Sequence, residues 1–315
     1  MPTISEAPTV ATAPGKIILV GEHAVVYGRP AIAAPVWGVK AIATLCNLAP
    51  GSGCFLIASD INLRLRLKEA SDDQPLALVT WLALRQVGIE QEPDWQIELR
   101  SELPIAGGLG SGAALSAALV QAIFAHVHHP INAEEVSKII YESERFYHGT
   151  PSGIDNTVIA YGAPLWFVKG EAPQLFHSTQ TLHLLIADSG IPSPTKETVG
   201  DVRCAWNLDR PRYEAWFDEI AEITHDARRC IEAGSAVELG KLFAHNQALL
   251  QQIGVSSPML DRLIDVAHQA GALGAKLSGG GRGGNVIALI EPSKRDLISR
   301  ALLDAGAKRV LNTVI

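Results

Sequence analysis

The sequence predicts a protein of mixed strands and helices in two domains, and three observations support this prediction. With 315 residues, the chain is long enough for one large or two ordinary domains. Its first half alternates strand-like and helix-like segments, whereas its second half is helix-rich from about residue 195 to 271 and then returns to strands. A polar stretch at 174–181 divides the halves, so we expect a boundary near 178–182 and domains of residues 1–180 and 181–315.

The first half begins with strands. Lys16–Val20 is a short apolar run that predicts a buried strand. Two more strands are expected at Ala31–Val36 and Lys40–Cys46, joined by a turn. Trp95–Arg100 alternates apolar and polar residues, which is typical of a half-buried strand.

Two helices follow. The segment 112–127 is apolar nearly all round, which predicts a buried helix. Asn132 is a suitable N-cap for a second helix over 133–147. Glu144 lies one turn beyond Ile140, at the edge of the inward face of that helix. Because burying a lone charge is costly, Glu144 is either a metal ligand or a boundary carboxylate paired with a surface base.

The second half starts with a strand at 182–187 and continues with helices. Its end combines two strands that flank a glycine loop, a helix and a last strand. We expect these elements at 272–277, 285–290, 292–305 and 309–315.

Composition and charge exclude several function classes. The formal net charge of −7 argues against nucleic acid or an anionic membrane as partner, because both favour a basic surface. The four cysteines form no CxxC pair, which predicts reduced thiols in a cytoplasmic protein instead of a zinc ribbon or redox dithiol. We expect neither a signal peptide nor a membrane span, because the N-terminus lacks an apolar core and the apolar segment after residue 112 is too short.

The stretch from Pro104 to Ala114 carries four glycines just before the expected buried helix. Glycines let backbone N–H groups face a ligand, and a helix start adds unpaired N–H donors and partial positive charge. The segment is therefore suited to an anion such as phosphate, although no Gly-Lys-Ser/Thr follows as in a Walker A loop. A glycine-rich turn that lets a buried helix pack closely is the alternative, and this segment alone does not decide.

A second glycine cluster, Lys276–Asn285, formally matches GxGxxG at Gly279, Gly281 and Gly284. A strand follows it instead of a helix, so the context of a dinucleotide-binding site fails. Five glycines make a long loop between two strands. Either the backbone approaches a bound ligand there or the loop is a flexible hairpin.

A third segment, Gly149–Asn156, holds a candidate catalytic carboxylate. A short helix from Ile154 places Asp155 in the first turn, where the helix N-terminus favours a carboxylate. Such a residue can accept or orient a hydroxyl proton, and ordinary helix capping is the alternative.

A fourth segment, Ala13–Gly28, places Lys16 at a strand start and Glu22 and His23 at its far end. Alone, these charged residues are also typical of solvated strand ends. Three further histidines lie at the end of the expected 112–127 helix, where the helix dipole favours imidazolium and a metal site would need another ligand: His126, His128 and His129.

Taken together and in this order, the four segments resemble the motifs of the GHMP small-molecule kinases, and within them the mevalonate kinase family. Residues 14–28 resemble the first motif, 104–114 the phosphate-binding second motif, 148–156 the segment with the catalytic Asp, and 276–285 the third motif. The resemblance spans nearly the whole chain. It implies an α+β fold with a ribosomal-protein-S5-like N-terminal domain and a ferredoxin-like C-terminal domain.

The resemblance also implies an activity: ATP-dependent phosphorylation of mevalonate to 5-phosphomevalonate in isoprenoid-precursor biosynthesis, with Mg²⁺, by a cytoplasmic monomer or homodimer. Asp155 would be the catalytic carboxylate, with Lys16 beside it, and Glu144 would be a Mg²⁺ ligand. Mevalonate would be held by Glu22, His23 and Thr195. The ATP-binding residues would lie in the two glycine loops: Pro104, Ala106, Gly107, Gly108, Leu109, Gly110, Ser111, Gly112, Gly279 and Gly280.

Two positions depart from the family pattern. Where this chain has Gly112, the family usually carries a serine whose hydroxyl helps to ligate Mg²⁺, so Ser111 or a water would take that role. In the third motif Arg282 replaces a common glycine and either meets phosphate or faces solvent.

Two alternative functions stay open. Another GHMP kinase, such as phosphomevalonate kinase, mevalonate 3-kinase or homoserine kinase, would share these motifs, although the run Gly21–Gly28 favours the mevalonate kinase family. A non-catalytic nucleotide-binding relative would explain Gly112. The joint presence of Lys16, Glu144 and Asp155 argues against it.

Overall fold

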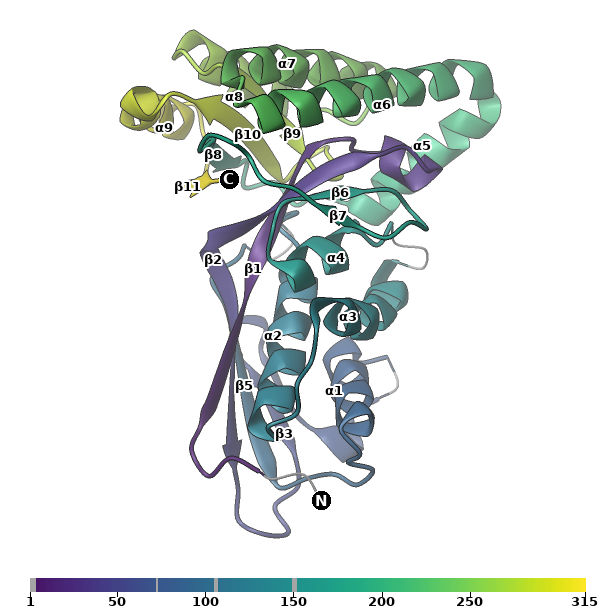
Figure 1. The fold of residues 1–315 in the computed structure, drawn as a ribbon, viewed down its shortest axis with the longest axis vertical. Helices are drawn as coiled ribbons and strands as arrows, with labels where there is room; N and C mark the ends of the chain where they lie inside the picture. The colour runs from purple at the N-terminus through teal and green to yellow at the C-terminus, as the bar shows by residue number, and fades with distance from the viewer. Residues whose placement is uncertain (1–3, 72, 105–106, 149–151) are drawn as a thin grey trace. The chain divides into compact units, whose positions relative to one another are not determined.

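The computed structural model, shown in Figure 1, describes residues 4–71, 73–104, 107–148 and 152–315. Contacts divide the described residues into two compact units, each treated by itself below. The first unit draws on Met1–Gly15, Val39–Leu103 and Gly110–Gly162. The second draws on Lys16–Gly38, Pro104–Leu109 and Ala163–Ile315. The chain therefore passes between the units several times, and a domain boundary near residue 180 stays a prediction.

Strands of the first unit follow the order β4-β3-β5-β2, with β1 also paired to β2. Strands β3 and β5 run parallel, whereas the β4–β3 and β5–β2 pairs are antiparallel. The bounds are β1 (Thr9–Val20), β2 (Ala31–Asn47), β3 (Phe55–Ala58), β4 (Leu63–Arg66) and β5 (Trp95–Ser101), with 3₁₀ turns η2 (Ser59–Ile61) and η3 (Leu67–Glu69).

Four helices complete the first unit: α1 (Pro75–Gln86), α2 (Ser111–His126), α3 (Ala133–His148) and α4 (Ile154–Tyr161). They pack on one another, and Figure 1 shows them together along one side of strands β3 and β5. Helix α2 is buried over most of its length, as its apolar sequence predicts. The predicted cap of α3 is confirmed, because Asn132 Oδ1 accepts from the N–H of Glu135 at 2.9 Å and Glu135 Oε2 accepts from the N–H of Asn132 at 3.0 Å.

The second unit contains a four-stranded antiparallel sheet in the order β11-β8-β10-β9. The chain passes through β8, a set of helices, β9, β10, one helix and β11, which is the βαββαβ order of a ferredoxin-like domain. The strands are β8 (His183–Asp188), β9 (Gly274–Ser278), β10 (Asn285–Ile290) and β11 (Arg309–Val314). This arrangement, together with the mixed first unit, confirms the predicted α+β class.

Helices pack on this sheet, with α7 and α8 against β9 and α9 against β8 and β11. The second unit also holds a short antiparallel group in which β6 pairs with residues 31–33 of β2 and with β7. The remaining bounds are η1 (Ala24–Tyr27), β6 (Leu165–Phe167), β7 (Gln174–Leu175), α5 (Thr195–Leu208), α6 (Arg210–Ala233), α7 (Ala236–Ile253), α8 (Pro258–Gln269), η4 (Pro292–Lys294) and α9 (Arg295–Asp304). In the described part of the chain no helix has the length and apolar character needed to cross a bilayer.

Two strand predictions need correction. The two strands expected at 31–36 and 40–46 are one continuous strand, β2. Trp37 and Gly38 are exposed yet extended, so this stretch marks a solvent-facing part of the strand and not a turn. Strand β1 also begins at Thr9, earlier than the predicted start at Lys16.

Candidate active site

The first glycine loop is held in the second unit through two of its carbonyl groups. The backbone N–H of Lys16 donates to the carbonyl of Leu109 at 2.9 Å, and the side-chain amide of Asn285 donates to the carbonyl of Gly107. Gly108 has a φ of +78°, a conformation that favours glycine. Ala106 lies outside the described residues. Pro104 and Gly107 border a cavity of about 510 Å³ whose lining includes Lys308 and Arg309.

The start of helix α2, in the first unit, places two neighbouring residues against different partners. Gly110 caps the helix with a φ of +75°, and Ser111 begins it, so the first N–H groups have no partner within the helix. The hydroxyl of Ser111 lies 3.3 Å from that of Ser101 on β5. A Cβ on Gly112 would lie 3.8 Å from Glu144 Oε1. Position 112 thus faces the predicted metal ligand, whereas Ser111 faces a serine.

Glu144 fits a magnesium site. Its carboxylate is buried, at 6% exposure, and lies near the first turn of α2. Mg²⁺ is usually held by one or two carboxylates together with substrate phosphate oxygens, so a dedicated cage of side chains is not needed. Among the described residues no group of three His, Cys, Asp or Glu residues forms such a cage.

Asp155 lies in the first turn of α4, as the sequence predicts. Gly153 precedes the helix with a φ of +89°. The amide of Asn156 donates to the carbonyl of Ser137 at 3.2 Å and to its hydroxyl at 2.8 Å, which fixes α4 against α3. Residues 149–151 of the same motif lie outside the described residues, and the role of Asp155 stays a prediction.

Glu22 forms a buried ion pair that the sequence analysis missed. Lys276 Nζ donates to Glu22 Oε1, and both side chains are fully buried. Lys276 Nζ also donates to the carbonyl of Leu277 at 2.5 Å. Burial raises the pKa of Glu22, and the ammonium group of Lys276 opposes that shift. A lysine inside the buried strand β9 (Gly274–Ser278) was the available signal, because a buried lysine needs a partner.

His23 is buried and strained. Its φ of +60° is unusual for a residue with a side chain, and such outliers concentrate at functional sites. Nε2 lies 3.1 Å from the carbonyl of Gly280, so the ring donates this proton and Nδ1 is left as an acceptor. Burial lowers the pKa of His23 to about 4, which keeps the ring neutral at pH 7.

The second glycine loop passes close to protein atoms at several positions. A Cβ on Gly280 would lie 2.7 Å from Thr195 Oγ1, which brings this predicted substrate residue next to the loop. A Cβ on Gly281 would lie 2.0 Å from the carbonyl oxygen of Val255. The loop is therefore packed at these positions, which argues against the flexible hairpin, one of the two alternatives for this segment.

Arg282, the departure in the third motif, has a φ of +58°. Its guanidinium pairs with Asp201 of α5 at 2.5 Å, and both side chains are substantially exposed. Of the two interpretations of Arg282, this pairing favours the one in which it faces solvent.

The predicted residues thus fall into two groups. In the second unit the contacts above join Lys16 to the loop at 107–109 and join His23 and Thr195 to Gly280. Glu22 pairs instead with Lys276. In the first unit Glu144 belongs to α3, and its carboxylate lies near the first turn of α2. Asp155 lies on α4, which packs against α2 and α3. Gly279 has the carbonyl of Gly108 as its nearest protein neighbour, at 3.8 Å from a built Cβ.

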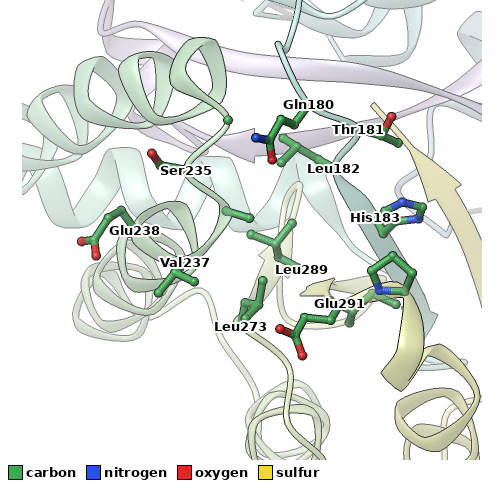
Figure 2. Close-up of a pocket in the computed structure, with 14 residues that line it drawn as sticks. Gln180, Thr181, Leu182, His183, Ser235, Val237, Glu238, Leu273, Leu289 and Glu291 are labelled. Atoms are coloured by element: carbon green, nitrogen blue, oxygen red, sulfur yellow. The ribbon is translucent and has the colours of Figure 1, made fainter.

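A cavity of about 530 Å³ lies elsewhere in the second unit (Figure 2). It borders the ends of β9 and β10 that are opposite to the glycine loop, at Leu273 and Leu289. Its carboxylates Glu238 and Glu291 pair with nearby lysines at 2.7 and 3.4 Å. None of the predicted site residues lines this cavity.

His126, one of the three histidines at the end of α2, has a structural explanation. His126 is fully buried, and its two ring nitrogens lie 2.9 Å from Thr9 Oγ1 and 3.0 Å from Asn47 Oδ1. Its polar atoms are satisfied by protein partners, as expected of a core histidine.

Comparison with known proteins supports the predicted family. Residues 75–163 match the model described as GHMP kinases N terminal domain, and residues 227–308 match GHMP kinases C terminal. Mevalonate kinase of Archaeoglobus fulgidus is 34% identical over 90% of this chain and 93% of its own length. Mevalonate kinase of Pyrococcus abyssi is 30% identical over 97% of this chain and 95% of its own length.

Solved structures agree. The crystal structure of L. major mevalonate kinase in complex with R-mevalonate matches with a TM-score of 0.86 and 28% identity, over 100% of this chain and 98% of that one. A Streptococcus pneumoniae phosphomevalonate kinase shares the fold, with a TM-score of 0.82, but only 14% identity. The chain belongs to the GHMP kinase family, within its mevalonate kinase branch.

Proposed function

We propose that this chain phosphorylates mevalonate at its 5-hydroxyl group, with ATP as donor and 5-phosphomevalonate and ADP as products. The observation that carries the proposal is the likeness to mevalonate kinases over at least nine-tenths of the chain, with all four motifs in order. Free cysteines, such as buried Cys54, suit a reducing cytoplasm.

The proposed mechanism depends on positioning and on charge, as phosphoryl transfer usually does. The glycine loop and the first turn of α2 bind the phosphates of ATP through backbone N–H groups. Glu144 would hold Mg²⁺, which would supply positive charge to neutralise the negative charge that develops on the phosphate oxygens. The substrate oxygen forms a bond to the γ-phosphorus while the bond to the ADP oxygen breaks.

Asp155 accepts or orients the proton of the attacking hydroxyl group, and Lys16 stabilises the developing charge on that oxygen. Glu22, His23 and Thr195 hold the acceptor. Since His23 is neutral, its Nδ1 is suited to accept a hydrogen bond from a substrate hydroxyl group.

The direct test measures ADP release with Mg-ATP against mevalonate, phosphomevalonate, homoserine and galactose. Turnover with mevalonate alone is the expected result. Turnover restricted to another acceptor would reassign the substrate, and ATP binding without any turnover would favour a non-catalytic relative.

Replacement of the catalytic carboxylate tests the mechanism. Asp155→Ala is expected to lower kcat by roughly 10²–10⁴, the usual range for a general base. Asp296→Ala is the matched control, because Asp296 also lies in the first turn of a helix, α9, but is largely exposed. An Asp155→Ala enzyme with unchanged kcat would remove this residue from the mechanism.

A further inference from the structure

We infer that Asn285 is a positioning residue of the phosphate loop: it holds the carbonyl of Gly107 and so turns the N–H of Gly108 to the opposite side, where phosphate would bind. The inference rests on the proposed function for the identity of the anion. It concerns a residue outside the sets predicted for ATP, metal and mevalonate.

The contact itself is well defined. Asn285 is the first residue of β10 and is buried, at 1% exposure. Its Nδ2 donates to the carbonyl oxygen of Gly107, 178 residues earlier in the chain. The nitrogen must face this oxygen, because the other amide orientation would place two acceptors together.

The peptide geometry supplies the next step. In a trans peptide the C=O of one residue and the N–H of the next point in opposite directions. A carbonyl of Gly107 held toward β10 therefore directs the N–H of Gly108 away from β10. Within the described part of the chain no acceptor takes a hydrogen bond from that N–H.

The neighbouring contacts strengthen this constraint. The carbonyl of Leu109 is held by the N–H of Lys16, so the loop is fixed at two alternate residues. The backbone of Gly284 runs beside the same oxygen, since a Cβ added at Gly284 would lie 3.4 Å from it, so a side chain at position 284 would crowd the held carbonyl. A loop fixed in this way binds an anion without first having to reorganise.

The carbonyl oxygen of the Asn285 side chain indicates why the choice of asparagine at this position needs an explanation. Asn285 Oδ1 is buried and has no hydrogen-bond partner among the described residues. The rest of β10 is apolar and buried, so an apolar residue at position 285 would avoid this unpaired oxygen. The asparagine is therefore explained by what its donor does for Gly107.

Two substitutions test the inference through ATP affinity. Asn285→Asp keeps the shape but loses the donor, and Asn285→Ala loses the donor without adding charge. Both are expected to raise the Kd for Mg-ATP, measured by calorimetry, by roughly 10- to 100-fold, which corresponds to about 1.4–2.7 kcal/mol of binding free energy. The KM for mevalonate is expected to change less than threefold.

Gln247→Glu is the matched control, because Gln247 is a buried amide in the same unit with its donor on Ser256 at 3.1 Å. It is expected to lower the Tm about as much as Asn285→Asp and to leave the Kd for ATP unchanged. If only Asn285→Asp weakens ATP binding, charge repulsion explains the effect and the inference is wrong. Unchanged ATP affinity in both Asn285 variants overturns it as well.

A measurement on the wild-type protein covers the case in which the variants do not fold. Bound Mg-ATP is expected to protect the amide of Gly108 from hydrogen exchange, and an unprotected amide contradicts the inference. A wild-type chain that fails to bind ATP at all would instead refute the proposed function, so the two failures are distinguishable.

Discussion

The two glycine-rich segments look alike in sequence, but several of their glycines lie in different surroundings, with Gly107 (a Cβ there would lie 2.9 Å from the Pro104 side chain) and Gly279 (3.8 Å from the nearest neighbour) as the exceptions in each. In the first, a Cβ on Gly108 or on Gly112 would meet no protein atom closer than 3.8 Å. In the second, a Cβ on Gly281 would lie 2.0 Å from Val255 and one on Gly283 would lie 2.4 Å from Pro192. The open positions leave space for a ligand, whereas the packed positions let the loop pass between neighbouring segments.

This difference shows that a run of glycines does not by itself indicate a binding loop. Gly281 and Gly108 have nearly the same φ, +79° and +78°. Their surroundings differ. The comparison is therefore testable by placing the same methyl group at each position.

The largest effect is expected for Gly281→Ala. The positive φ costs an alanine about 1 kcal/mol, and the contact with the Val255 carbonyl adds strain that brings the total to roughly 4 kcal/mol or prevents folding. Gly108→Ala carries the backbone cost without the contact and is expected to lose only ~1 kcal/mol. Urea unfolding of both variants checks the pair, and equal losses would contradict the distinction between open and packed glycines.

A slightly smaller loss of folding stability is expected at acid pH, through His23, which contacts the packed second glycine loop. Since the pKa of His23 falls from 6.5 to about 4 on folding, the folded state binds fewer protons between these values. Stability should be complete above pH 6.5 and decrease as the pH falls toward 4, by about 3 kcal/mol in total.

Replacement of His23 isolates this contribution. His23→Gln retains a side-chain amide for the Gly280 carbonyl but does not titrate. Unfolding midpoints at pH 7.5 and 4.5 are expected to differ less in this variant than in the wild type. The same acid sensitivity in both proteins would show that other groups cause it.

The smallest effect is expected at the open end of the first segment. Gly112→Ser should stabilise helix α2 by roughly 0.5 kcal/mol, because glycine is a poor helix residue. Its hydroxyl group would lie beside Glu144 and should tighten Mg²⁺ or Mn²⁺ binding about threefold or more, or ~0.7 kcal/mol. Gly112→Ala is the control, since it should stabilise helix α2 to a similar extent without adding a metal ligand. Equal metal affinity in the two variants would show that a hydroxyl group at position 112 does not contact the metal.

The sequence predicted the elements that have strong local signals. Helix α2 is apolar on all sides, and α3 carries its own cap at Asn132, so both were found from their own residues. Strand β2 was divided in two because Trp37-Gly38 resembles a turn in composition, although this stretch is extended within one continuous strand. Lys276 and Asn285 were missed because their partners, Glu22 and Gly107, lie 254 and 178 residues away. Such pairs are set by tertiary structure, which local patterns do not contain.

The interleaving of the two units has a consequence for how the chain is made. Residues Lys16–Gly38 belong to a unit whose remaining bulk begins only at Ala163, 125 residues later. At a synthesis rate of about 5–20 residues per second, this early segment waits on the order of 10 s on the ribosome. Ile17–Val20 and Ala31–Val36 are apolar and are buried in the folded protein. During that interval a nascent chain therefore exposes two aggregation-prone apolar segments that chaperones can bind.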